Sequence, residues 1–130
     1  MKTGTKVLLV DDEVEFVRTL AERLQIRGIQ ALVATDGAEA LQVVEEETPQ
    51  IVVLDLMMPG LGGLEVLHRL KENHPEIKVI LLTGHGSTKE GIQGMRLGAF
   101  DYLMKPVRIE ELIKKMGEAY EAPVNPSQTR

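Results

Sequence analysis

A chain of 130 residues with 43% hydrophobic and 27% charged residues is predicted to form one globular domain that folds in water, because this composition is neither that of a disordered protein nor that of a membrane span. The formal net charge is −5, and because the Lys and Arg residues are dispersed, the sequence gives no sign of a surface for direct binding of nucleic acid. Cysteine is absent, which excludes disulfides, thiolate catalysis and thiolate metal sites.

The first apolar run along the chain is typical of a strand and not of a secretion signal. Residues Lys6–Val10 are followed at once by acidic residues, where a signal peptide would continue with apolar ones, so we expect a cytoplasmic protein. Four further short aliphatic runs are predicted strands: Gln30–Ala34, Gln50–Leu54, Lys78–Leu82 and Phe100–Met104.

Segments with helical periodicity follow each predicted strand. The first ends at Gly28, the second is capped by Asp36, the third stops near Pro75, and the fourth opens with the capping box Ser87–Glu90. The residues that mark the inward faces of the first, second, third and fifth helices are Val17, Leu20, Ala21 and Leu24; Ala40, Leu41 and Val44; Leu64, Leu67 and Leu70; and Ile109, Leu112, Ile113 and Met116.

This alternation favours a sheet with helices on both faces. Strands that are apolar throughout are usually covered on both sides, as they are in parallel sheets. Five strand–helix units are too few for a closed barrel, so we predict an α/β fold, a flavodoxin-like (βα)5 doubly wound parallel sheet with strand order 2-1-3-4-5. This domain is expected over residues 1–120, followed by a polar tail or linker stub over residues 121–130, which contains two prolines.

Polar residues stand where the predicted strands end. In a doubly wound sheet the carboxyl ends of the strands lie on one edge, and ligands bind there at the point where the strand order reverses. The residues expected on this edge are Asp11, Asp12 and Glu13 after the first strand, Asp55 after the third, Thr83 after the fourth, and Lys105 with Pro106 after the fifth.

The acidic residues of this edge predict a metal site. Carboxylates brought together repel one another and raise each other's pKa unless a cation lies among them. Oxygen ligands without cysteine or a well-placed histidine favour a hard ion, and a site with few carboxylates suits Mg²⁺ better than Ca²⁺. With the ion placed by Asp11 and Asp12, Asp55 can act as a nucleophile toward a phosphoryl group. Lys105 and Thr83 can then stabilise the phosphoryl oxygens.

Four segments of the chain carry a resemblance to a known family: VLLVDDE, IVVLDLMMPG, VILLTGHG and GAFDYLMKP. Together they resemble the receiver domains of response regulators in two-component signalling, such as chemotaxis regulators, over roughly residues 6–120. The resemblance implies that Asp12, Asp55 and the backbone carbonyl of Met57 bind Mg²⁺, with Asp11 assisting through water. It also implies that Asp55 takes a phosphoryl group from a histidine kinase or phosphotransfer histidine and loses it by hydrolysis.

The same resemblance implies a conformational switch. Thr83 and Lys105 match the switch threonine and the signalling lysine of the family, and Tyr102 matches the aromatic residue whose rotamer reports phosphorylation. The Lys105–Pro106 bond matches the family's cis peptide. Phosphorylation is then expected to draw Thr83 toward the phosphoryl oxygens and to vacate space for Tyr102. This changes the surface of the fourth predicted helix, the fifth strand and the fifth helix, where a partner or effector domain binds.

Such a domain is not an enzyme in the usual sense, because it catalyses only its own phosphorylation and dephosphorylation. Its expected partners are the kinase or phosphotransfer protein and an output protein or effector domain. Neither nucleic acid nor a membrane is an expected direct partner.

Three other functions fit parts of the pattern. A Mg²⁺-dependent phosphatase with an Asp nucleophile needs a second acid two residues later, where Met57 stands. A nucleotide or flavin binder of this fold lacks both the P-loop pattern and G-x-G-x-x-G. A pseudo-receiver that interacts without being phosphorylated is the main alternative, although it does not require the complete set of site residues.

Three glycines stand where a helix would favour another residue. At Gly62 the family often has an acid or amide, so the start of the third helix lacks a side-chain cap worth up to about 1 kcal/mol. Gly91 and Gly94 each cost roughly 1 kcal/mol relative to alanine in a helix interior. We therefore expect the fourth helix to be the least stable element.

Overall fold

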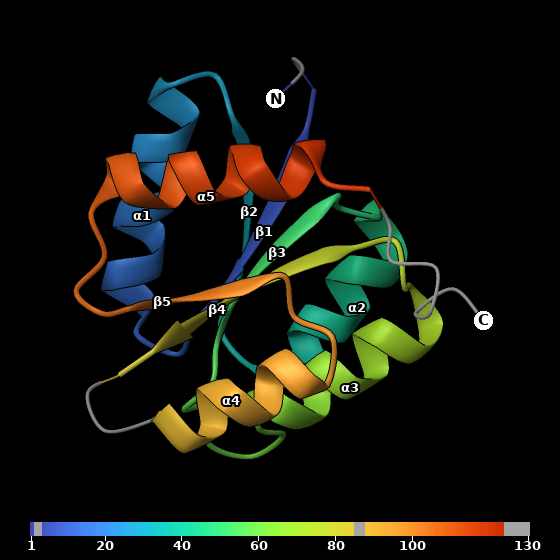
Figure 1. The fold of residues 1–130 in the computed structure, drawn as a ribbon. Coiled ribbons are helices and arrows are strands. Elements are labelled where there is room, and N and C mark those ends of the chain that lie inside the picture. Colours follow the sequence, from blue (N-terminus) through green and yellow to red (C-terminus); the bar gives the residue numbers. More distant parts are fainter. Residues whose placement is uncertain (2–3, 85–87, 124–130) are drawn as a thin grey trace.

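The chain folds into one parallel sheet flanked by helices. The computed structural model describes residues 1, 4–84 and 88–123 (Figure 1). The strands lie in the order β2-β1-β3-β4-β5 and are all parallel, as predicted. Within the described ranges, no helix has the length and apolar character needed to cross a membrane. The elements in chain order are β1 (Lys6–Val10), α1 (Val14–Ile26), β2 (Gln30–Ala34), α2 (Gly37–Glu47), β3 (Ile51–Asp55), α3 (Gly63–Asn73), β4 (Lys78–Thr83), α4 (Thr88–Arg96), β5 (Asp101–Met104) and α5 (Ile109–Glu121).

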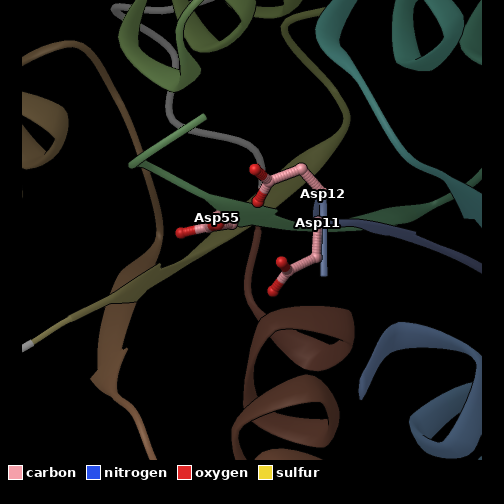
Figure 2. Close-up of side chains that lie close together, drawn as sticks. All are labelled: Asp11, Asp12 and Asp55. Atoms are coloured by element: carbon pink, nitrogen blue, oxygen red, sulfur yellow. The ribbon is translucent and has the colours of Figure 1, made fainter. Parts of the chain in front are cut away.

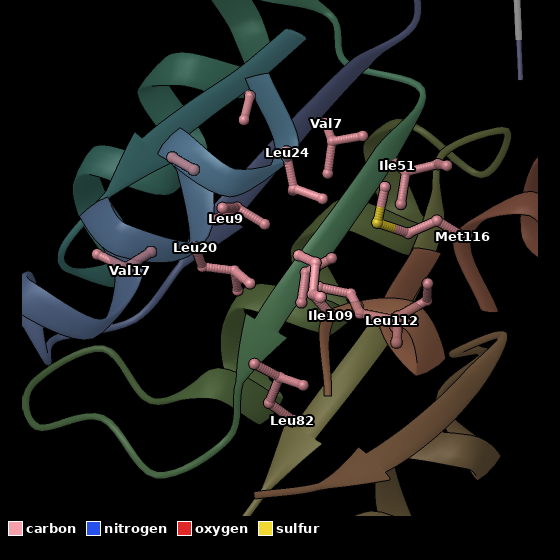
Figure 3. Close-up of a cluster of buried hydrophobic side chains, with 14 of the residues drawn as sticks. Val7, Leu9, Val17, Leu20, Leu24, Ile51, Leu82, Ile109, Leu112 and Met116 are labelled. Carbon is pink, nitrogen blue, oxygen red and sulfur yellow. The ribbon is translucent and has the colours of Figure 1, made fainter. Parts of the chain in front are cut away.

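Two apolar clusters, one on each face of the sheet, hold the layers together. Successive residues of a strand point to opposite faces, so Leu9 packs on one side and Leu8 on the other. On the first face Leu9 joins Leu24 of α1 and Leu112 of α5 (Figure 3). On the second face Leu8 joins Leu67 of α3 and residues of α2. β1, β3 and β4 are buried along nearly their whole length because both of their faces are covered.

The edge strands are less covered than their apolar sequences predicted. In β5, Leu103 is buried, whereas Tyr102 is 43% and Met104 is 50% exposed. β2, at the other edge, is also only partly buried. An edge strand has a neighbour on one side only, so the flanking layers leave part of it in contact with solvent.

Two strands extend one residue further than predicted. Asp55 is the last residue of β3, where it pairs with Leu82, and Thr83 is the last residue of β4, where it pairs with Met104. β3 and β5 each begin one residue later than predicted. Because the sheet holds their backbones, Asp55 and Thr83 project from rigid strands and not from loops.

The helix ends follow the predicted signals where they are described. Gly28, with φ of +80°, follows α1 in the left-handed region that glycine favours. Asp36 caps α2 by accepting a hydrogen bond from the Glu39 amide at 2.8 Å. Gly62 is the N-cap of α3 and forms no side-chain capping bond. The predicted capping residue Ser87 lies outside the described residues.

The two glycines of α4 differ in their surroundings. A Cβ atom at Gly94 would lie 2.3 Å from Cδ1 of Leu81, a fully buried residue of β4, so the helix and the sheet approach more closely than alanine allows. A Cβ atom at Gly91 would lie 3.7 Å from Cγ2 of Thr83, which is an ordinary contact. Packing therefore requires Gly94, whereas Gly91 only lowers the helix propensity. The low stability expected for α4 stays a prediction.

Replacing the two glycines by alanine is expected to have opposite effects. Gly91→Ala should raise the free energy of unfolding by about 0.5–1 kcal/mol, because it improves helix propensity without a clash. Gly94→Ala should lower it by about 1 kcal/mol or more, because overpacking against Leu81 outweighs the same gain. Urea denaturation of both variants and the parent measures these changes. Equal stabilisation by the two substitutions would show that α4 does not pack this closely.

Candidate functional site

The predicted site residues lie at the carboxyl ends of four strands. Asp11 and Asp12 directly follow β1, Asp55 and Thr83 end β3 and β4, and Lys105 follows β5. A backbone hydrogen bond joins the ends of β4 and β5, in which the Lys105 amide donates to the Thr83 carbonyl at 2.8 Å. The sheet therefore fixes the backbone beneath these side chains.

Three carboxylates converge at this edge. One oxygen from each of Asp11, Asp12 and Asp55 lies within 4.8 Å of the others, and Figure 2 shows the three side chains together at the ends of β1 and β3. Asp11 and Asp55 are 1% and 4% exposed, whereas Asp12 reaches solvent. Oδ1 of Asp11 accepts a hydrogen bond from the Glu13 amide at 2.9 Å, and Oδ1 of Asp55 accepts one from the Met57 amide at 3.2 Å. Each buried carboxylate therefore has its second oxygen left for other groups.

The ammonium group of Lys105 lies among these acids. Its Nζ atom is 2.7 Å from Oδ2 of Asp11, 2.8 Å from Oε1 of Glu13 and 3.7 Å from Oδ2 of Asp55. Within the part of the chain that the structure describes, Oδ2 of Asp11 has no hydrogen bond of regular geometry, so the ion pair with Lys105 balances its charge. Burial lowers the pKa of Lys105, but pairing with Asp11 and Glu13 outweighs burial and raises the pKa above its usual value. The lysine is therefore held in its charged form.

The pKa of Asp55 is raised from 3.8 to about 6. Burial of the carboxylate is the largest cause, and the hydrogen bond from the Met57 amide opposes it. The charge of Asp11 raises the pKa, that of Lys105 lowers it, and that of Asp12 raises it again. One ammonium group thus does not offset burial and two neighbouring carboxylates.

The donor atoms suit a hard divalent cation. The three carboxylates offer only oxygen ligands, two of the three are buried, and their repulsion contributes to the raised pKa of Asp55. A bound cation relieves this repulsion, and a small set of carboxylates with room for water suits Mg²⁺. The cluster can therefore bind a metal ion. The predicted part of the Met57 backbone carbonyl in binding it stays a prediction.

The residues predicted to form the switch lie on adjacent strands. Thr83 is 3% exposed, and its hydroxyl donates a long hydrogen bond of 3.4 Å to the Leu103 carbonyl. Tyr102 is 43% exposed, so its side chain is not packed in the core. The Lys105–Pro106 peptide bond is cis, as the resemblance implied. The roles of these residues in a switch stay predictions.

Two contacts of Lys105 were not predicted from the sequence. Glu13 was placed at this edge without a role and Phe16 was not singled out, yet Nζ of Lys105 lies 4.9 Å from the centre of the Phe16 ring and pairs with Glu13. Glu13 directly precedes α1 and Phe16 lies in its first turn, so their spacing of three residues allows both side chains to reach the same neighbour. That spacing, directly after the Asp pair, is the signal that could have found them.

The raised pKa of Asp55 predicts how stability depends on pH without a metal ion. Because the folded-state pKa of about 6 exceeds the unfolded value near 3.8, stability is lost as the pH rises between these values. Asp55→Asn removes this loss. At pH 7.5 in EDTA it should raise the free energy of unfolding by about 1–3 kcal/mol, and the gain should vanish near pH 4. Denaturation at several pH values measures the difference, and an equal gain at both extremes would assign it to packing.

A family profile and curated relatives match most of this chain. A profile of the response regulator receiver domain matches residues 7–117. The uncharacterized transcriptional regulatory protein YkoG of Bacillus subtilis is 39% identical over 113 residues, which cover 87% of this chain and 50% of the relative. The response regulator MprA of Mycolicibacterium vanbaalenii is 39% identical over 111 residues, which cover 85% of this chain and 48% of the relative. The chain thus spans about half the length of the curated relatives it matches.

Solved structures of receiver domains superpose closely on this fold. A receiver domain protein of Clostridium thermocellum has a TM-score of 0.85 and 35% identity, with 89% of this chain and 94% of that chain covered. The receiver domain of NtrX from Brucella abortus has a TM-score of 0.85 and 34% identity, with 90% and 99% covered. The profile match and these relatives show that the chain belongs to the response regulator receiver domain family of two-component systems.

Proposed function

We propose that this receiver domain accepts a phosphoryl group on Asp55 from the phosphohistidine of a histidine kinase or phosphotransfer protein. The observation that supports this most strongly is that Asp11, Asp12 and Asp55 meet at one edge of the sheet, with Lys105 among them. A pseudo-receiver needs the fold but has no use for this arrangement. Phosphorylation is therefore the better explanation of the site.

In the proposed transfer, a carboxylate oxygen of Asp55 attacks the phosphorus atom of the donor. An O–P bond forms, the P–N bond to the donor imidazole breaks, and the imidazole keeps the electron pair of that bond and takes up a proton from solvent. Attack by water later breaks the link, which restores the carboxylate and releases inorganic phosphate. Because Oδ1 of Asp55 accepts a hydrogen bond from the Met57 amide, Oδ2 is the oxygen that remains for the phosphoryl group. The domain catalyses only these two steps on itself.

Asp12, Asp55 and the backbone carbonyl of Met57 are the groups that we propose to hold Mg²⁺, with Asp11 acting through water. When bound, the ion supplies positive charge that neutralises the carboxylates and the phosphoryl oxygens. Asp12 is exposed and can meet an ion that enters from solvent. Asp11 is buried and fixed by the Glu13 amide, which suits a residue that orients its neighbours.

Lys105 and Thr83 are proposed to bind the oxygens of the phosphoryl group. Nζ of Lys105 lies 3.7 Å from Oδ2 of Asp55, so a short movement of the lysine side chain would bring its ammonium into contact with a group added to that oxygen. The hydrogen bond that the hydroxyl of Thr83 donates to the Leu103 carbonyl is long, at 3.4 Å, and a bond of this length is easily exchanged for one to a phosphoryl oxygen. Movement of Thr83 would leave space into which the exposed ring of Tyr102 can turn, close to the cis bond before Pro106.

The surface of α4, β5 and α5 is proposed to pass this change to a partner or effector domain. An effector domain is supported by the length of the relatives, some of which are named as transcriptional regulators. We propose a receiver unit over residues 1–120 and a tail or linker stub over residues 121–130; α5, the last described element, ends at Glu121, within one residue of this boundary. The apolar side chains exposed on α4 and β5 are Ile92, Met95, Tyr102 and Met104.

Incubation of the 130-residue chain with acetyl phosphate and Mg²⁺ tests the proposed acceptor. We expect one phosphoryl group per chain, stable in mild acid and lost in base, and none on Asp55→Asn. Asp36→Asn is the matched control, because it makes the same change at a helix N-cap where asparagine also caps well. Mass spectrometry and phosphate-affinity electrophoresis give the readout. A parent chain that stays unlabelled at millimolar Mg²⁺ would favour the pseudo-receiver.

A further inference from the structure

Lys105 is engaged by groups that keep its ammonium away from Asp55. Its Nζ atom lies 2.7 Å from Asp11 and 2.8 Å from Glu13, and it faces the ring of Phe16 at 4.9 Å. Asp55, at 3.7 Å, is the most distant of its three carboxylate neighbours. The ammonium of Lys105 is therefore already paired with Asp11 and Glu13 before a phosphoryl group reaches the site.

The carboxylate of Glu13 does not cap the helix that it precedes. Glu13 is the N-cap residue of α1, yet its side chain forms no capping hydrogen bond. Its own amide is fixed by Oδ1 of Asp11, and its side chain, 63% exposed, reaches back to Lys105. Glu13 pairs with a lysine of the site and does not cap the helix, which points to a role in that site.

We propose that Glu13 is a positioning residue that holds Lys105 in a withdrawn position and competes with the phosphoryl group on Asp55 for its ammonium. This inference rests on the proposed function of Asp55. In the unphosphorylated chain Glu13 and Asp11 share the lysine. To bind the phosphoryl oxygens, Lys105 must leave Glu13, so Glu13 slows phosphorylation.

The size of this effect follows from the exposure of Glu13. Ion pairs of exposed side chains contribute little, so removing the competing charge should raise the rate constant of phosphorylation by about twofold to fivefold, and not by orders of magnitude. Simple repulsion between Glu13 and an anionic donor would produce a gain of similar size. The experiment must therefore separate competition for Lys105 from repulsion.

The rate constant for phosphorylation by acetyl phosphate at fixed Mg²⁺ is measured on the full chain, on Glu13→Gln and on Glu15→Gln. Glu15, in the first turn of α1, gives the matched control, because its substitution removes the same charge two residues further on. We expect a gain of about twofold to fivefold for Glu13→Gln and little change for Glu15→Gln. No gain for Glu13→Gln, or the same gain for both variants, would overturn the proposal.

The same substitution is then made in a Lys105→Met chain. If Glu13 acts by competing for the lysine, the gain disappears when the lysine is absent. If Glu13 repels the donor, the gain is the same in both backgrounds and the proposal fails.

A crystal structure of Glu13→Gln without phosphodonor gives a readout that does not depend on phosphorylation or on the folding of the lysine variant. Nζ of Lys105 should move from 3.7 Å to about 3 Å from Oδ2 of Asp55. An unchanged distance between these two atoms would contradict the proposal that Glu13 holds Lys105 away from Asp55. If the parent chain is never phosphorylated, the proposed function of Asp55 fails, whereas the lysine position still tests the role of Glu13.

Discussion

Three carboxylates and one ammonium group at a single edge of the sheet are the constraint on which the rest of this structure depends. Asp11 and Asp55 are buried, and buried acids stay ionised side by side only when positive charge lies among them. Lys105 supplies one such charge, and the raised pKa of Asp55 shows that it is not enough. A divalent cation would restore the balance and would also favour the approach of a negatively charged phosphoryl group.

The parallel sheet is what brings these groups together. Because the strands run in one direction, residues placed at the ends of β1, β3, β4 and β5 arrive at the same edge. Apolar clusters on both faces keep the central strands rigid, so Asp55 and Thr83 are held by the sheet itself. The neighbouring edge strand is more open, since the side chains of Tyr102 and Met104 in β5 are exposed. A rigid site next to a partly exposed edge strand suits a signalling domain.

Local patterns predicted the strand order and the gathering of the acidic residues, because aliphatic runs and their polar ends are visible along the chain. Other features depend on tertiary contacts that no local pattern reports. From helix propensity alone, Gly94 was expected to destabilise α4. In the structure, Leu81 lies so close that a larger side chain at this position would clash with it. The pairing of Glu13 with Lys105 joins residues 92 positions apart. Apolar composition likewise did not reveal how much of each edge strand the helices leave exposed.

Titration of the metal-free chain with Mg²⁺, followed by amide NMR, tests the central electrostatic claim most directly. Neutralisation of crowded carboxylates predicts saturable shifts at the amides of Asp12, Asp55 and Met57, consistent with one site. The same titration of Asp12→Asn, with its fold intact, should lose this saturation. Shifts that never saturate in the parent chain, or that saturate equally in the variant, would contradict a magnesium site at this edge.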